Sequence, residues 1–178
     1  MSRELWILRH GKAERYDYTE DFDRTLKKRG KRDAKRMGEW LKDQHLLPDL
    51  VISSPATRAY MTAKIACEAL GIDRQHIQLE KRLYDEGLTR VRSALAEVPV
   101  TFKRVLLVGH NPELEDLLTY LVERSALPDI DKLLPTAALA GLTLPEDWSQ
   151  LNPGCAQLLS ISYPKRLSAD SFDPDAFD

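Results

Sequence analysis

Three short runs of branched apolar residues constrain the fold of this chain more than any other feature. They are residues 4–8 (ELWIL), 49–54 (DLVISS) and 104–109 (RVLLVG). Runs of this length, rich in Val, Ile and Leu, are typical of buried β-strands. The second and third runs lead into Ser54-Pro55 and Asn111-Pro112, each a capping side chain followed by a proline suited to the first helical position. The sequence therefore predicts strand–turn–helix units.

Apolar residues at helical spacing fill the segments between these runs. We expect helices over about 25–47, 55–70 and 88–98, the first with Leu26, Ala34, Met37 and Leu41 at helical spacing. Strands separated by helices favour a parallel-rich sheet with helices on both faces. The segments 134–144 and 155–163 look like two more strands with no long helix between them. We expect this pair to be antiparallel near a sheet edge, which makes the sheet mixed.

The length of 178 residues suits one domain, which we place at residues 1–164. Residues 165–178 carry four Asp among the last nine positions and are expected to form an acidic tail. A net charge of −2 argues against a protein built to bind nucleic acid or an anionic membrane. No apolar run approaches the length of a membrane helix, and the charged N-terminus does not resemble a signal peptide. Two widely spaced cysteines, Cys67 and Cys155, favour a reducing cytoplasm.

Cationic side chains follow all three apolar runs. Arg9, His10 and Gly11 end the first, Arg58 falls in the first turn of the helix after the second, and His110 and Asn111 follow the third. In an open α/β sheet, ligands bind just beyond the carboxyl ends of the strands. We therefore expect two Arg and two His at one edge of the sheet. Arg58 is notable because the helix dipole disfavours a cation in the first turn, unless an anion binds there.

Such a set of cations favours an anion site, and phosphate is the natural ligand. A neutral imidazole can also attack phosphorus, so one histidine is a candidate nucleophile. Alternatives remain open at this point. Each His or Arg taken alone could be polar surface, Gly11 could serve a tight turn, and the two histidines could begin a metal site. A metal site would need carboxylates or a third His, and the neighbouring arginines would repel the ion.

The motifs around these residues resemble those of the histidine phosphatase superfamily. LRHGKAE resembles its R-H-G signature, SSPATRAYMTA its second block, and VLLVGHNPELEDLL its G-H-N-P block. Within the superfamily, the small SixA-like phosphohistidine phosphatases are the most similar, and the similarity runs from about residue 4 to 164. The resemblance implies a three-layer α/β/α sandwich around a mixed, mostly parallel sheet.

The resemblance also implies roles for the residues at the strand ends. His10 would be the nucleophile that is transiently phosphorylated, while Arg9, Arg58 and His110 would hold the phosphoryl oxygens. Gly11 and Asn111 are expected to contribute to substrate binding. No metal and no organic cofactor are implied.

Two departures from the family pattern affect the remaining candidates. DRTLKKRG has Lys27 or Lys28 where the family often has Thr, so Arg24 is retained only as a substrate-binding residue at the rim. KRLYDEGL offers Asp85 and Glu86 as a general acid, and we take Glu86 as the candidate. The alternative for both carboxylates is an ordinary acidic loop before the third helix.

These observations predict a metal-independent phosphatase whose substrate is a phosphohistidine on a protein. A small-molecule phosphomonoesterase on the same machinery and a phosphate-binding module without turnover are the alternatives. The run 27–36 has seven Lys or Arg in ten residues. It is either a solvated helix face or a docking patch for an acidic protein substrate.

Overall fold

The first strand is buried on both faces, and this organises the molecule. In the computed structural model, which describes residues 2–167, Leu5 and Ile7 of β1 (Arg3–Arg9) belong to one hydrophobic core. Trp6 and Leu8, on the opposite face of the strand, belong to a second core. Side chains alternate across a strand, so four consecutive apolar residues require a cover on each side of the sheet.

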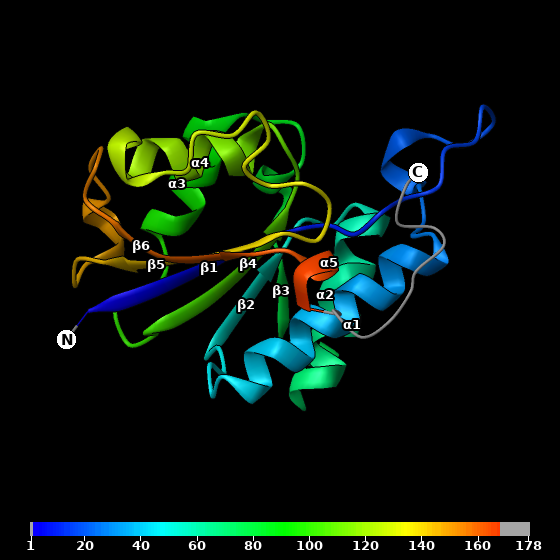
Figure 1. The fold of residues 1–178 in the computed structure, drawn as a ribbon, viewed down its shortest axis with the longest axis horizontal. Coiled ribbons are helices and arrows are strands. Elements are labelled where there is room, and N and C mark those ends of the chain that lie inside the picture. Colours follow the sequence, from blue (N-terminus) through cyan, green and yellow to red (C-terminus); the bar gives the residue numbers. More distant parts are fainter. Residues whose placement is uncertain (1, 168–178) are drawn as a thin grey trace.

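Helices supply both covers (Figure 1). The other strands are β2 (Leu50–Ser53), β3 (Ile77–Leu79), β4 (Arg104–Gly109), β5 (Leu139–Leu144) and β6 (Gln157–Ser162). The helices are α1 (Lys28–Asp43), α2 (Thr57–Leu70), α3 (Leu88–Ala96), α4 (Glu113–Leu121) and the short α5 (Pro164–Leu167). Side chains of α1 and α2 fill the core on one face, and those of α3 and α4 fill the core on the other.

The sheet has the strand order β3-β2-β4-β1-β5-β6. The first four strands in this order are parallel, whereas β5 runs antiparallel to β1 and β6 antiparallel to β5. The expected three-layer sandwich with a mixed, mostly parallel sheet is therefore confirmed. Strand β3 was not expected from the sequence, because it has three residues and only Ile77 is buried.

The first helix is shorter at both ends than the expected 25–47. Leu26 is not helical, because it forms an isolated antiparallel bridge with Ala13. The N–H of Lys27 also donates to the carbonyl of Lys12, which keeps this segment extended until Lys28. At the other end the chain leaves the helix near His45, which has a φ of 58°. Ala34, Met37 and Leu41 are buried as expected.

Neither expected helix cap has the predicted geometry. Helix α2 begins at Thr57, so Pro55 precedes it and Arg58 is its second residue. Ser54 instead accepts a hydrogen bond from the N–H of Ala56 within the turn. The amide of Asn111 donates to a carbonyl oxygen of a distant loop, so it does not cap α4. Each side chain also makes a contact with a distant part of the chain, Ser54 with Nε2 of His110 and Asn111 with Leu134, which a local pattern cannot specify.

The C-terminal strands are also shorter than expected. Only Leu139–Leu144 of the segment 134–144 is extended, and residues 134–138 form a loop that returns to the strand ends. The second segment forms β6 (Gln157–Ser162). Part of the expected acidic tail, residues 165–167, belongs to α5, and residues 168–178 lie outside the described residues. No helix within residues 2–167 is long and apolar enough to cross a membrane.

Candidate active site

The two histidines meet where β1 and β4 end side by side. Arg9 and Gly109 are register partners at the carboxyl ends of these parallel strands, so the next residues, His10 and His110, emerge at the same edge. Their ring centroids are 5.2 Å apart, and the exposed fractions are 7% and 5%. The sheet thus brings together two imidazoles that are 100 positions apart in the sequence.

His10 has a defined tautomer. Its Nδ1 lies 2.7 Å from the carbonyl oxygen of Gly11, which can only accept, so Nδ1 carries the proton. The Nε of Arg58, which can only donate, lies 3.3 Å from Nε2 of His10. Both contacts require a lone pair on Nε2. Burial lowers the pKa of His10 to about 3, which keeps the ring neutral and Nε2 nucleophilic near pH 7.

Gly11 is required by the approach of a helix. A Cβ at this position would lie 2.6 Å from the carbonyl oxygen of Gly30, in the first turn of α1. The N–H of Gly11 donates to the hydroxyl of Thr62 in α2, at 3.0 Å. Close packing against α1, and not the expected binding of substrate, explains why residue 11 is a glycine. Its backbone packs against α1 and α2 and fixes the carbonyl that orients His10.

This close approach predicts that Gly11→Ala damages both stability and catalysis. The added methyl group must push α1 away from the turn, at an expected cost of about 1–3 kcal/mol in the free energy of unfolding. Urea denaturation measures that loss, and phosphatase assays on the folded fraction measure the activity. Gly71→Ala, at the exposed C-terminal end of α2, is the control for activity: no atom lies within 4 Å of its would-be Cβ, but its φ of 76° means that it too should lose some stability. An equal loss of activity in both variants would contradict the assignment.

His110 presents its other ring nitrogen to the site. Its Nε2 lies 2.8 Å from the hydroxyl of Ser54, and that hydroxyl already accepts the N–H of Ala56. The Ser54 hydroxyl can donate its proton to Nε2, and in that tautomer Nδ1 carries the ring proton. Burial, followed by the charge of Arg58, lowers the pKa of His110 to about 3. A bound phosphoryl dianion would act in the opposite direction and favour the charged ring.

Arg9 and Asn111 reach the same loop. The guanidinium of Arg9 and the amide of Asn111 both donate to the carbonyl oxygen of Leu134, at 3.1 and 2.8 Å. The N–H of Leu134 in turn donates to the carboxylate of Glu115. The Asn111 amide thus holds the wall of the site, and its predicted contact with substrate remains a prediction.

Unsatisfied polar atoms are concentrated at this edge of the sheet. Among residues 2–167, buried side-chain atoms without a hydrogen-bond partner include Nε of Arg9, Nδ1 of His110 and Oδ1 of Asn111. Native proteins rarely leave such atoms unpaired, and when they do the group often has a functional role. Nε of Arg9 is a donor, and Nδ1 of His110 is a donor when Ser54 donates to Nε2; both side chains lie close enough to His10 for their charges to lower its pKa. The arrangement suits an oxyanion with several oxygen acceptors, as expected for a phosphoryl group.

Two residues of the site were not identified from the sequence. Asp21, in the 3₁₀ helix η1 (Asp21–Asp23), accepts hydrogen bonds from NH1 of Arg58 through its backbone and from NH2 through its carboxylate. Tyr84 donates its hydroxyl to the same carboxylate, and its ring packs edge-on against His110. Asp21 lies three residues before the Arg24-Thr25-Leu26 segment, and nothing in the local sequence indicates that its carboxylate contacts Arg58. The predicted rim residue Arg24 also pairs with Asp21, at 3.0 Å.

The candidate acid Glu86 is held outside this network. Its carboxylate forms an ion pair with Arg90, one helical turn further along the chain, at 3.5 Å. Asp85 is exposed and has a φ of 55°, which places it at a sharp turn between Tyr84 and α3. Glu86 thus forms an ion pair with an arginine on the surface, and the role of Glu86 as a general acid remains a prediction.

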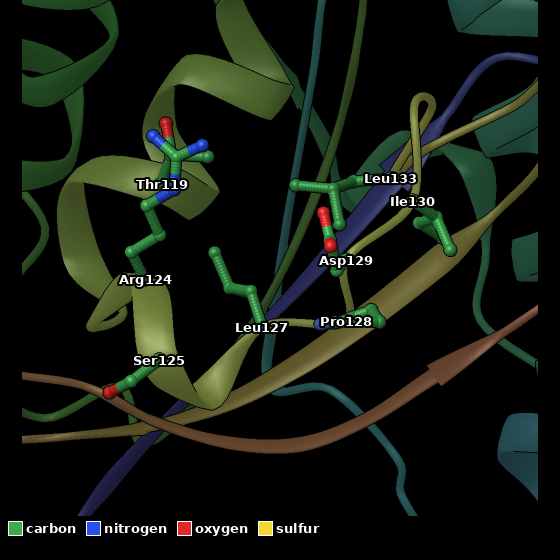
Figure 2. A pocket seen from close by; sticks show the side chains of 8 residues that line it. All are labelled: Thr119, Arg124, Ser125, Leu127, Pro128, Asp129, Ile130 and Leu133. Carbon is green, nitrogen blue, oxygen red and sulfur yellow. The ribbon is translucent and has the colours of Figure 1, made fainter.

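A surface hollow elsewhere in the molecule lacks the cationic groups of this site. A hollow of about 700 Å³ lies between the end of α4 and the loop 127–133. Figure 2 shows the side chains that line it: Thr119, Arg124, Ser125, Leu127, Pro128, Asp129, Ile130 and Leu133. It contains none of the converging Arg and His side chains. Within the part of the chain that the structure describes, no three His, Cys, Asp or Glu side chains are grouped so that they could hold a metal ion.

The depressed pKa values predict that acid destabilises the fold. In the unfolded chain a histidine takes up its proton near pH 6.5, whereas His10 and His110 do so only near pH 3 in the folded protein. Between these two pH values the unfolded state binds more protons than the folded state. The free energy of unfolding should therefore fall as the pH falls from about 6.5 to 3, by up to about 1.4 kcal/mol per pH unit for each histidine. Urea denaturation at several pH values measures the slope. His10→Asn should reduce it, and an unchanged slope would contradict the assignment.

Comparison with known proteins agrees with this geometry. A sequence model of the histidine phosphatase superfamily (branch 1) matches residues 5–86, a span that includes His10 and Arg58. An uncharacterised protein of Mycobacterium tuberculosis is 31% identical over 163 residues, which cover 89% of this chain and all of that protein.

Two solved structures share the fold and part of the sequence. A putative phosphohistidine phosphatase SixA from Nakamurella multipartitia superposes with a TM-score of 0.77 at 28% identity, over 92% of this chain and 97% of the other. A protein histidine phosphatase SixA complexed with tungstate gives 0.76 at 25% identity, over 92% and 99%. Motif, fold and site agree, and the chain belongs to the histidine phosphatase superfamily.

Proposed function

We propose that the protein is a metal-independent phosphatase that removes the phosphoryl group from phosphohistidine on a protein. The observation that carries this proposal is the neutral His10, with its proton fixed on Nδ1 and its lone pair on Nε2 beside Arg58. A histidine held in this tautomer is prepared to act as a nucleophile toward phosphorus. The phosphohistidine substrates named for the two similar SixA structures support the choice of substrate.

The reaction has two displacements. In the first, Nε2 of His10 forms a bond to phosphorus while the bond to the leaving group breaks, and the leaving group takes the electron pair. In the second, water attacks the phosphorylated His10, which releases phosphate and restores the neutral ring. Arg9, Arg58 and His110 surround the phosphoryl oxygens and stabilise the charge on them in both transition states.

The leaving group favours phosphohistidine over alkyl phosphates. An alkoxide needs an acid to protonate it as it departs, whereas a ring protonated on its free nitrogen leaves as neutral imidazole. The candidate acid Glu86 is paired with Arg90 on the surface. With Glu86 paired in this way, we expect phosphohistidine to be cleaved much faster than alkyl phosphates.

A direct comparison of substrates tests the proposal. The purified protein is assayed on a histidine-phosphorylated protein, a phosphoserine peptide and small phosphomonoesters, each with and without chelator. We expect preference for phosphohistidine and no effect of chelator. Preference for the small esters would favour the small-molecule phosphomonoesterase, and binding of phosphate without turnover would favour the non-catalytic module.

A basic surface beside the site suits an acidic protein partner. Lys12 lies two residues after His10, and its carbonyl accepts a hydrogen bond from the backbone N–H of Lys27. Helix α1 begins directly after Lys27. Burial lowers the pKa of Lys12, and the charges of Arg29, Lys27, Arg15 and Lys132 lower it further, so these cations lie close together. Lys28, Lys31 and Lys35 are exposed along α1. We propose that this surface attracts the acidic face of the substrate protein.

Charge reversal on α1 tests this surface. Lys31→Glu should raise KM for the protein substrate by roughly fivefold, about 1 kcal/mol, because it places a negative charge against an acidic partner. Activity on a small phosphoester should be unchanged. Lys42→Glu, on the last turn of the same helix, is the matched control. A large loss on the small substrate would show instead that the basic helix reaches the reacting groups.

A further inference from the structure

The guanidinium group of Arg58 lies between the Asp21 carboxylate and the nucleophile His10 and contacts both. Arg58 donates through Nε to Nε2 of His10 at 3.3 Å and through NH2 to Oδ2 of Asp21 at 3.1 Å. Tyr84 donates to the same oxygen at 2.7 Å, and Arg24 donates to Oδ1 at 3.0 Å. Burial raises the pKa of Asp21, but these hydrogen bonds and the charge of Arg58 outweigh it, so the net pKa is well below the usual range.

An ionised carboxylate at this place has no evident purpose for stability or for binding phosphate. The Asp21 side chain is 54% exposed, and an ion pair with that much solvent contributes only about 0–1 kcal/mol to folding. Its negative charge also repels a phosphoryl dianion and competes with it for Arg58. A substrate that carried only an anion would be bound better without Asp21.

The surroundings of Asp21 are aromatic. The ring of Tyr84 packs edge-on against both Phe22 and His110, with centroid distances of 5.1 and 5.4 Å. Phe22 is 39% exposed, so this aromatic wall reaches the mouth of the site. A carboxylate beside an aromatic wall complements a flat ring that carries an N–H and a positive charge.

We propose, on the basis of the proposed function, that Asp21 with Tyr84 and Phe22 forms a subsite for the imidazolium ring of a phosphohistidine substrate. The Asp21 carboxylate accepts the N–H of the ring nitrogen that does not carry the phosphoryl group. The aromatic wall of Phe22 and Tyr84 contacts the face or edge of the ring. Arg58 then connects the two ends of the substrate, because it contacts Asp21 and donates hydrogen bonds to the oxygens of the phosphoryl group.

This contact favours the reactive form of the substrate, and the step balances. The phosphoimidazolium ring carries one proton, on the nitrogen facing Asp21. Nε2 of His10 bonds to phosphorus, the substrate P–N bond breaks, and its electron pair stays on the ring nitrogen. The leaving ring keeps its proton and departs as neutral imidazole, so no proton transfer is needed during the displacement. The carboxylate stabilises the protonated ring before the step and raises its pKa.

Asp21→Asn tests whether Asp21 binds the substrate ring or only positions Arg58, because this substitution keeps the shape of the side chain and removes its charge. The activities to compare are kcat/KM for a histidine-phosphorylated peptide and for 4-nitrophenyl phosphate, whose leaving group carries no N–H. We expect the ratio of the two to fall at least about tenfold, the loss expected for a charge-assisted hydrogen bond. The alkaline limb of the pH profile of kcat for the phosphohistidine peptide, which reports the pKa of the bound ring, should also move to lower pH. Asp23→Asn, exposed in the same short helix, is the matched control.

Each other outcome has a definite meaning. If both activities fall alike and the ratio is constant, Asp21 only positions Arg58 and the inference is wrong. A lower ratio with an unmoved alkaline limb also overturns it, because the carboxylate would then not hold the proton. If the wild-type protein cleaves 4-nitrophenyl phosphate but not the phosphohistidine peptide, the proposed function itself fails and the subsite fails with it.

Discussion

His10→Ala is expected to abolish turnover on every substrate, with a loss on the order of 10⁴-fold or more, because no other group can take the place of Nε2. Steady-state assays measure the loss. In wild-type protein, brief incubation with substrate followed by denaturation should trap a phosphoryl group that is labile to acid and stable to alkali, as expected for phosphohistidine. Peptide mapping should place it on His10, and the variant should carry none.

The fold should survive this change. Removing the ring leaves the Gly11 carbonyl and the Arg58 Nε without their partners, which should cost about 1–3 kcal/mol out of a total stability of about 5–15 kcal/mol. Urea denaturation therefore distinguishes lost chemistry from lost structure. His76→Ala, at an exposed position in a 3₁₀ helix, is the matched control and should keep full activity. Near wild-type turnover by His10→Ala would refute the covalent mechanism.

Arg58→Ala is expected to lower kcat by about 10²–10³, which corresponds to about 3–4 kcal/mol of transition-state stabilisation. Arg58 contacts both the nucleophile and Asp21, so its loss removes a positive charge from the phosphoryl site and also the contact that connects these two residues. Arg58→Lys keeps the charge but not the planar set of donors, and should recover only part of the rate.

Separate kcat and KM values decide what Arg58 does. A fall in kcat with a smaller change in KM indicates a contact that strengthens in the transition state, whereas a change confined to KM would indicate uniform binding of the substrate. Arg74→Ala removes an exposed guanidinium outside the site and should leave both constants unchanged. A similar loss of rate in both arginine variants would show that the effect is not specific to the site.

The local sequence pattern was sufficient to predict the strands that position His10, Arg58 and His110. The apolar runs that became β1, β2 and β4 are buried on both faces, which is a property of consecutive residues and can be read from the sequence. Parallel strands that end at one edge bring together whatever follows them. For that reason, the meeting of His10, His110 and Arg58 could be expected without any coordinates.

Tertiary contacts decided the rest. Asp21 meets Arg58 across 37 positions and Tyr84 across 63, and the Leu134 carbonyl meets Arg9 across 125. Ser54 and Asn111, which were expected to cap helices, instead contact His110 and the Leu134 carbonyl. The sequence by itself determined the layered sheet and the cationic edge, because both follow from short-range periodicity. The packing that requires Gly11 and the position of the Asp21 carboxylate were decided only by the folded structure, because each depends on a partner that is distant in the sequence. The tautomer of His10 depends on the turn that brings the neighbouring Gly11 carbonyl to Nδ1 and on the contact of Nε2 with Arg58, which is 48 positions away.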